Sequence, residues 1–248
     1  MSVYAVILAA GQGTRMRPLS YYLPKILLPV RGEPVLNYLI RNIDSLEPDG
    51  IYIVASEYLE VISKYLEKTN CKNVRVVRGL EFETGGDLSL AIEQIEGSDQ
   101  DAIVMNGDIV TDVDMKEVYN FHKKTDSYVT ASLFEMNDLE EAKRFGRVQI
   151  DRNGKILKFI EKAQTSPDGR PLVSVGFYIF DKKFMEMRGS YFSNKRSKLE
   201  IDLFPRLSSE GRMYGYVTKP KYWWDVGTLE SYIKAENFMI NKEGILPP

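Results

Sequence analysis

The segment Gly11-Gln12-Gly13-Thr14-Arg15 directly follows an apolar run, and its residue types suit the binding of phosphate groups. Glycines after a buried strand let backbone N–H groups approach phosphate oxygens closely, and an arginine can contact two such oxygens at once. The dinucleotide-binding fingerprint would need a third glycine at position 16, where this chain has methionine. The pattern favours a polyphosphate site and leaves a plain tight turn as the alternative.

Lys25 is the next residue whose type could serve phosphate chemistry. It lies ten residues after Arg15, between Pro24 and an apolar stretch that ends at Pro29. A lysine held there could place a point charge beside phosphate oxygens. A surface lysine whose ammonium group stays in water is the ordinary alternative, and Lys25 alone does not decide between the two.

Taken together, residues 8–34 resemble the signature of the sugar-1-phosphate nucleotidylyltransferases. They read LAAGQGTRMRPLSYYLPKILLPVRGEP, and the family pattern is Gly-x-Gly-Thr-Arg-(Leu/Met)-x-Pro-Leu-(Thr/Ser), then Pro-Lys-x-(Leu/Met)-(Leu/Val)-Pro-(Val/Ile). The resemblance implies that Arg15 and Lys25 are catalytic, because they neutralise charge as pyrophosphate leaves a nucleoside triphosphate. It also implies a set of nucleotide-binding residues: Leu8, Ala10, Gly11, Gly13, Thr14, Arg15 and Lys25.

Two aspartates far apart in the chain extend the resemblance. Asp108 ends the segment Asn106-Gly107-Asp108, similar to the family's Gly-Asp, and Asp225 lies in a segment similar to its Trp-x-Asp-(Val/Ile)-Gly-Thr. The family's two aspartates are catalytic and hold Mg²⁺, which prefers octahedral oxygen ligation with one or two carboxylates. Such an ion suits a reaction between two phosphate anions. For either aspartate alone, a turn-capping or helix-capping carboxylate is the alternative.

The resemblance also implies a sugar-phosphate site in the second half of the chain. Glu161-Lys162 resembles the family's Glu-Lys, and Phe145-Gly146-Arg147-Val148 resembles its Tyr-Gly-x-Val. Residues 173–180 resemble its Asn-Ala-Gly-(Ile/Phe)-Tyr strand, although serine replaces the asparagine. The implied sugar-phosphate-binding residues are Gly146, Glu161, Lys162, Ser174 and Gly176. Without the resemblance, Glu161-Lys162 would be interpreted as a solvated charge pair.

Thr84, Gly85 and Gly86 match a family loop that contacts the nucleobase, so the resemblance adds them to the nucleotide-binding residues. Asp87, which follows, is less usual there. We expect it to cap a helix that begins near Leu88, with a ligand contact as the alternative.

The elements that must position these residues alternate between strand and helix. Short continuous apolar runs indicate strands that are buried on both faces, as in a parallel sheet. Strands are expected at residues 4–10, 50–55, 74–77 and 101–105, with helices at 34–43 and 88–95. In open α/β sheets ligands bind beyond the carboxyl ends of the strands, so we expect the Gly11 loop and Asp108 to share one crevice.

Beyond about residue 128 the pattern predicts mainly antiparallel strands, at residues 128–133, 146–151 and 155–160, with Asp151-Arg152-Asn153-Gly154 as a hairpin turn. We therefore expect an α/β fold with a Rossmann-like, mostly parallel mixed sheet flanked by helices. Residues 1–248 would form a single domain, with nucleotide binding at about 1–125 and an antiparallel extension that binds the sugar phosphate at about 126–248. Larger family members continue into hexapeptide repeats, and we expect no such tail here.

Composition narrows the classes of partner. The net charge of −2, from 33 basic and 35 acidic residues, gives no global positive field for nucleic acid. One cysteine and one histidine, His122, exclude an internal disulfide and an ordinary His/Cys zinc site, and we interpret His122 as structural. No signal peptide or membrane span is evident, so we expect a cytoplasmic protein without membrane partners.

The predicted activity is Mg²⁺-dependent transfer of a nucleoside monophosphate from a triphosphate to a sugar 1-phosphate. GTP with mannose 1-phosphate is the leading pair, ahead of UTP or dTTP with glucose 1-phosphate. The alternatives are a non-catalytic nucleotide-sugar-binding regulator, an acceptor such as phosphocholine, and a dinucleotide-dependent oxidoreductase, which the missing glycine disfavours. A homo-oligomer is compatible with the sequence. Residues 195–198 are expected to form a solvated face. Residues 200–207 resemble a family segment whose role is mainly packing, and the resemblance implies the same role here.

Overall fold

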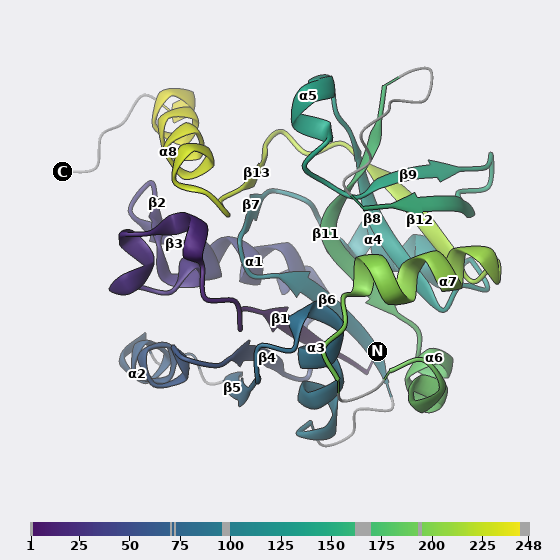
Figure 1. The fold of residues 1–248 in the computed structure, drawn as a ribbon, viewed down its shortest axis with the longest axis horizontal. Helices are drawn as coiled ribbons and strands as arrows, with labels where there is room; N and C mark the ends of the chain where they lie inside the picture. The colour runs from purple at the N-terminus through teal and green to yellow at the C-terminus, as the bar shows by residue number, and fades with distance from the viewer. Residues whose placement is uncertain are drawn as a thin grey trace.

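The structure is a computed structural model that describes residues 2–69, 71, 73–95, 100–161, 170–192 and 195–243. A nine-stranded mixed sheet runs through the molecule (Figure 1), with the order β10-β9-β11-β6-β1-β4-β5, and β8 and β12 join it through β11. Its strands are β1 (Val3–Leu8), β4 (Ile51–Ala55), β5 (Val74–Arg78), β6 (Asp101–Asn106), β8 (Val129–Glu135), β9 (Arg147–Ile150), β10 (Ile156–Ile160), β11 (Leu172–Phe180) and β12 (Met213–Thr218).

Strands β6, β1, β4 and β5 are parallel, and β11 pairs antiparallel with β6, β8 and β9. Two small ribbons lie outside this sheet: β2 (Pro29–Val30) pairs with β3 (Glu33–Pro34), and β7 (Ile109–Thr111) pairs with β13 (Trp223–Asp225). The expected mostly parallel sheet with an antiparallel extension is confirmed.

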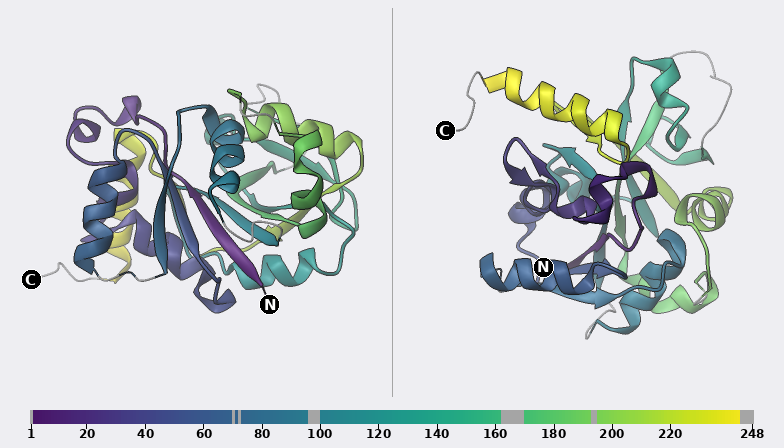
Figure 2. Two further views of the ribbon diagram at one scale, coloured as in Figure 1. Left: turned by 90° about the horizontal axis from the view of Figure 1, so that it is seen from below. Right: turned by 60° about the vertical axis from the view of Figure 1, so that its left-hand side comes forward.

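Helices cover both faces of the sheet (Figure 2). The core on one face includes side chains of α1 (Val35–Ile43), α2 (Leu59–Thr69), α4 (Met115–His122) and α8 (Leu229–Glu243). The core on the other face includes side chains of α3 (Glu83–Glu93), α6 (Lys182–Met187) and α7 (Phe204–Ser209), and the short α5 is Leu139–Ala142. In β1, Val3, Ala5 and Ile7 enter the first core while Tyr4 and Val6 enter the second, which explains its continuous apolar sequence.

The predicted hairpin between β9 and β10 is present. Its turn places Gly154 at a φ of 82°, a left-handed conformation that glycine adopts without strain. The Asp151 carboxylate accepts hydrogen bonds from the backbone N–H groups of Asn153 (2.8 Å) and Lys155 (2.9 Å). Among the described residues, no helix combines the length and apolar character needed to cross a membrane.

Helix α3 corrects one expectation, because it begins at Glu83 rather than near Leu88. Asp87 therefore lies inside the helix and is not its cap. Its Oδ1 accepts from the backbone N–H groups of Leu80 (2.8 Å) and Phe82 (3.2 Å), so it holds the loop that enters the helix. The two glycines of the first turn have low helix propensity, but their N–H groups donate to the Ser197 carbonyl (2.9 and 3.2 Å), a tertiary contact that outweighs propensity.

Candidate functional site

The carboxyl ends of β1 and β6 bring the glycine loop and Asp108 together. The two strands pair in parallel register, with Leu8 opposite Asn106. The Gly107 N–H donates to the Leu8 carbonyl at 2.9 Å, and a Cβ at Gly107 would lie 2.8 Å from that oxygen. Only glycine fits this close approach, so the sequence Asn-Gly-Asp places the Asp108 carboxylate directly beside the Gly11 loop.

Lys25 pairs with Asp108 across this crevice. It begins the short helix η3 (Lys25–Leu27), whose Ile26 and Leu27 are buried and fix its place, and its Nζ donates to Asp108 Oδ2. The two side chains are only 20% and 18% exposed. Burial opposes the charge on Asp108, but the Lys25 ammonium and the Arg15 guanidinium outweigh it and lower the pKa of Asp108. Asp108 is therefore held as a carboxylate.

Asp225 reaches the same point from the other end of the chain. Strand β13 pairs antiparallel with β7, which places Asp225 opposite Ile109, and the Val226 N–H donates to the Asp108 carbonyl at 2.8 Å. Burial and the neighbouring Asp108 charge raise the pKa of Asp225. The Gly227 N–H, at 2.7 Å from Oδ1, and the Arg144 guanidinium, at 3.8 Å, partly compensate that effect. The two carboxylates thus repel each other in a site suited to a cation.

Gly227 marks the point on which these groups converge. A Cβ placed there would lie 2.7 Å from Asp225 Oδ1, 3.4 Å from Arg15 Nη2 and 3.4 Å from Asp108 Oδ2. A side chain at position 227 would therefore push on both carboxylates and on the arginine.

Gly227→Ala is expected to lower turnover by about 10²-fold with little loss of stability, because a shift of about 1 Å in reacting groups has that effect. The measurement is kcat together with the thermal midpoint. Gly189→Ala is the matched control, since a Cβ at that glycine meets no atom within 4 Å. Equal kcat values for the two variants would contradict this geometry.

A cavity of about 600 Å³ opens on one side of the Lys25–Asp108 pair. It is called the larger cavity below. Nine of the residues singled out by sequence line it: Leu8, Ala10, Gly11, Gly13, Thr14, Arg15, Lys25, Thr84 and Asp108. Its lining also includes Glu81, Glu83 and Arg196, which the sequence did not assign to a site, and Asp87, for which a ligand contact was the alternative to a helix cap. The Arg196 side chain is 72% exposed, as expected for a solvated face at residues 195–198, and it also borders this cavity.

Gly85 and Gly86 lie behind the lining of the larger cavity. A Cβ at Gly86 would lie 2.4 Å from the Lys195 carbonyl oxygen, and one at Gly85 would lie 2.8 Å from Ser197 Oγ. These glycines allow residues 195–197 to pack against the start of α3. The sequence assigned both glycines as nucleotide contacts, but neither of them lines the larger cavity. Thr84, which precedes them, does line it.

A smaller cavity of about 190 Å³ lies on the other side of Asp108. Gly146, Glu161, Ser174 and Gly176 line it, together with Asp225. Lys162, which the sequence grouped with them, falls outside the described residues. The remaining lining residues include Arg144, Phe145, Tyr178, Glu200 and Trp223. Arg15, Asn106 and Asp108 line both cavities, so the two meet at the converging charges.

A bulge in β11 shapes the smaller cavity. The pairing of β11 with β8 shifts register between Ser174 and Tyr178, and Gly176 takes a φ of 90°. Ser174 Oγ donates to the Tyr178 hydroxyl at 3.0 Å and accepts from the Gly176 N–H at 3.2 Å. A Cβ at Gly176 would lie 3.0 Å from Asn106 Nδ2. Serine at position 174 therefore stabilises the bulge, and Asn106 retains a buried Oδ1 without a hydrogen-bond partner among the described residues.

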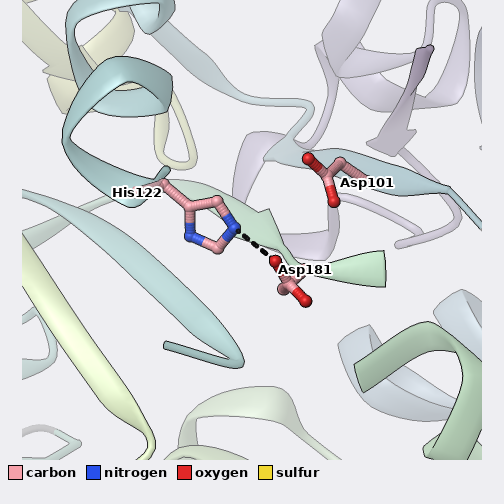
Figure 3. Close-up of side chains that lie close together, drawn as sticks. All are labelled: Asp101, His122 and Asp181. Carbon is pink, nitrogen blue, oxygen red and sulfur yellow. Dashed lines mark ion pairs between the residues drawn. The ribbon is translucent and has the colours of Figure 1, made fainter. Parts of the chain in front are cut away.

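His122 belongs to a separate buried cluster with Asp101 and Asp181 (Figure 3). Its Nδ1 lies 2.8 Å from Thr130 Oγ1, and its Nε2 faces Asp181 Oδ2 at 3.5 Å. Lys123 supplies the positive charge, with Nζ 2.8 Å from Asp101 Oδ2 and 3.9 Å from Asp181 Oδ2. Asp101 begins β6 and Asp108 follows its end, so the cluster lies at the opposite end of the sheet from the crevice. These contacts support a structural role for His122.

Asp101→Ala is expected to lower the free energy of unfolding by about 3 kcal/mol, because it leaves buried donors unsatisfied. The Asp101 carboxylate accepts from the Tyr119 hydroxyl (2.7 Å), the Lys182 N–H (2.8 Å) and Lys123. Urea denaturation checks the value. The exposed Asp49→Ala is the control, with an expected change of about 0.5 kcal/mol or less. An equally small change for Asp101→Ala would show that the hydrogen bonds of Asp101 contribute little to stability.

Comparison with known proteins agrees with this arrangement. Residues 4–242 match the sequence profile of the family described as "Nucleotidyl transferase". The mannose-1-phosphate guanylyltransferase of Mycobacterium tuberculosis is 27% identical over 99% of this chain and 66% of its own length. The UTP–glucose-1-phosphate uridylyltransferase of Synechocystis is 27% identical over 96% of this chain and 64% of its own. The bifunctional protein GlmU of Methanococcus aeolicus is 29% identical over 90% and 51%.

The chain thus spans between about half and two thirds of the length of these curated relatives. Among solved structures, HddC from Yersinia pseudotuberculosis superimposes with a TM-score of 0.75 and 29% identity, covering 96% of this chain and 100% of HddC. A second HddC structure, with the same values, was determined in complex with GMP-PN.

Proposed function

The chain belongs to the nucleotidyl transferase family, and we propose that it transfers a nucleoside monophosphate from a nucleoside triphosphate to a sugar 1-phosphate, releasing pyrophosphate. The observation that carries this proposal is the meeting of two cavities at Lys25, Arg15, Asp108 and Asp225. A transferase needs two substrates to approach each other at one point, with positive charge to receive phosphate oxygens. The resemblance to sugar-1-phosphate nucleotidylyltransferases is confirmed by the family match and the curated relatives.

The triphosphate is proposed to lie in the larger cavity against the glycine loop. Arg15 and Lys25 line that cavity together with Gly11, Gly13 and Thr14. An oxygen of the sugar phosphate, bound in the smaller cavity, attacks the α-phosphorus. One P–O bond forms, and the bond from the α-phosphorus to the bridging oxygen breaks as pyrophosphate leaves with the electron pair. The nucleophile is already an anion, so no general base is required.

Mg²⁺ is part of the proposal because the residues fit it. Asp108 and Asp225 present an all-oxygen donor set, and a Cβ at Gly227 would lie 3.4 Å from Asp108 Oδ2 and 2.7 Å from Asp225 Oδ1, so the two carboxylates border the same point. Hard cations such as Mg²⁺ take one or two carboxylates and keep other positions for phosphates and water. When bound, the ion would neutralise charge on the triphosphate. Lys25 holds the Asp108 carboxylate in place and lines the larger cavity, where its ammonium group would also neutralise phosphate oxygens.

The base is proposed to be guanine, recognised by Glu81. The strand order β6-β1-β4-β5 separates Asp108, after β6, from Glu81, after β5, by three strand spacings, about 14 Å. Glu81 has an unusual left-handed φ of 58°, and its carboxylate accepts from Gln12 Nε2 (2.8 Å) and Ser56 Oγ (3.1 Å). Guanine presents two adjacent donors to a carboxylate, whereas uracil and thymine present one donor between two carbonyls. The GMP-PN complex of HddC and the guanylyltransferase relative support this choice.

Glu81→Gln is expected to reduce the preference for GTP over UTP by about tenfold or more, because a lost charge-assisted hydrogen bond has that effect. The measurement is the ratio of kcat/KM for the two triphosphates. Glu60→Gln, an exposed position on α2, is the control and should keep the wild-type ratio. An unchanged ratio in Glu81→Gln would show that Glu81 does not select the base.

The acceptor is proposed to be a neutral sugar 1-phosphate, with mannose 1-phosphate as the leading candidate and glucose 1-phosphate as the second. The guanylyltransferase relative supports mannose and the uridylyltransferase relative supports glucose. Phosphocholine belongs in the same test, because aromatic side chains of Phe145 and Trp223 line the smaller cavity and such rings can hold a quaternary ammonium group.

The test is pyrophosphate release by the purified chain with Mg²⁺, across five nucleoside triphosphates against mannose, glucose, N-acetylglucosamine and heptose 1-phosphates and phosphocholine. Release with GTP and a sugar 1-phosphate is expected. If no pair released pyrophosphate and calorimetry showed tight binding of a nucleotide-sugar, the chain would be a regulatory binding protein and not a transferase.

A further inference from the structure

Thr84 joins the two cavities through one hydrogen-bonded bridge. It lies in the first turn of α3 and lines the larger cavity. Its Oγ1 donates to Glu200 Oε2 at 2.8 Å and accepts from the Leu199 N–H at 3.0 Å. Glu200 belongs to η6, the π-helical turn Leu199–Leu203, and lines the smaller cavity. A hydroxyl beside one substrate site therefore holds a carboxylate of the other.

The backbone around this bridge is fixed from both sides. The N–H groups of Gly85 and Gly86 donate to the Ser197 carbonyl, and the Ser197 N–H donates to the Phe82 carbonyl at 3.0 Å. A side chain at Gly86 would collide with the Lys195 carbonyl, so the close packing of these two segments requires glycine there. The start of α3 and the segment that leads to Glu200 are thus held together as one unit.

Glu200 has the environment of a residue that receives a ligand. Burial raises its pKa, and the Thr84 hydrogen bond acts in the opposite direction. Among the described residues, Thr84 is the only side chain that donates a hydrogen bond to it. Glu161 and the Tyr178 hydroxyl share the smaller cavity with it. A buried carboxylate has several lone-pair sites, and a donor from a ligand would relieve part of its desolvation. The expected packing role of residues 200–207 does not account for this exposure to the cavity.

We propose that Glu200 accepts hydrogen bonds from sugar hydroxyls and thereby determines sugar selection, and that Thr84 positions it from the nucleotide side. This inference rests on the proposed transferase function. A sugar offers hydroxyl donors in an arrangement that differs between epimers. A buried carboxylate left without its donor discriminates strongly against the wrong epimer, because the unpaired charge remains desolvated. The same carboxylate disfavours sugar acids, whose negative charge it repels.

The test compares Glu200→Gln with the wild type by steady-state kinetics for both substrates. The variant keeps the side-chain shape and loses the charge. The KM for the sugar 1-phosphate is expected to rise about 10-fold or more, and the ratio of kcat/KM for mannose and glucose 1-phosphates to move toward one. The KM for the triphosphate should change by less than about twofold, as expected for a group that does not touch it. Glu186→Gln, an exposed glutamate on α6, is the matched control.

Thr84→Val tests the bridge, because it removes the hydroxyl and keeps the branched shape. It should raise the KM for the sugar 1-phosphate by a smaller factor than Glu200→Gln. Combined with Glu200→Gln it should add little further, since the two residues act as one unit. Fully additive effects of the two substitutions would overturn the positioning role of Thr84.

Each remaining outcome has a separate meaning. If the wild type releases pyrophosphate and Glu200→Gln keeps both the sugar KM and the epimer ratio, this inference fails while the proposed function stands. If the wild type uses only phosphocholine, the role of Glu200 toward hydroxyls is overturned. If the wild type is inactive with every pair, the proposed function fails and this inference with it. A thermal midpoint for each variant shows that the compared proteins are folded.

Discussion

Asp108→Asn is expected to lower turnover by about 10³-fold or more while the protein stays folded. Asparagine keeps the shape of the side chain but removes the charge that pairs with Lys25 and that would hold Mg²⁺. Loss of a metal ligand removes several kcal/mol of charge stabilisation from the transition state, which corresponds to about this factor. Pyrophosphate release at saturating substrates is the measurement. Asp225→Asn should behave alike, because its carboxylate lies next to Asp108 across the β7–β13 ribbon.

The control for this experiment is Asp126→Asn. Asp126 is 67% exposed and pairs with Lys183 and Arg212 at the surface, where ion pairs contribute little. Its turnover should stay within about twofold of the wild type. Chelation with EDTA should abolish wild-type turnover, and added Mg²⁺ should restore it. Near-normal rates in both Asp108→Asn and Asp225→Asn would exclude a metal held by these two residues.

Lys25→Met is expected to lower kcat/KM for the triphosphate by about 10²–10³-fold, the usual effect of removing one group that stabilises transition-state charge. Methionine preserves much of the unbranched stem, which packs near Gly13, but cannot neutralise phosphate oxygens. It also leaves the partly buried Asp108 carboxylate without its main positive neighbour. Part of the loss should therefore appear in KM for the triphosphate and part in kcat.

Lys234→Met is the matched control for Lys25→Met. Lys234 forms a surface i,i+4 ion pair with Glu230 at 2.7 Å, and its side chain is 58% exposed. Its kinetic constants should remain within about twofold of the wild type. If Lys25→Met changed neither KM nor kcat, the Lys25–Asp108 pair would be a structural ion pair only.

The sequence predicted the sheet well where strands are buried on both faces. The apolar runs at β1, β4 and β6 match the structure to within two residues at every end, because a strand between two helix layers has no polar alternation to obscure it. The boundary of α3 could not be predicted in this way. Its glycine-rich first turn is stabilised by the Ser197 carbonyl, which comes from a segment more than 100 residues away.

The residues of the candidate site likewise fall into those that the sequence predicted and those that it did not. Lys25 and Asp108 were identified from the sequence because each lies within a segment that resembles a family motif, and the structure brings their side chains into contact. Glu81, Arg196 and Glu200 carry no local signal. A single charged residue on a loop or a helical turn is the same in sequence whether it lines a cavity or faces water.

By itself, the sequence determined the family, the glycine loop after β1 and the residue types suited to triphosphate chemistry, because these depend on neighbours along the chain. The tertiary structure decided what surrounds them. Pairing of β13 with β7 sets Asp225 beside Asp108, and packing of residues 195–200 on α3 lets Thr84 hold Glu200. These contacts join segments separated by about 115 residues, and long-range contacts form by packing and loop closure that no local periodicity encodes.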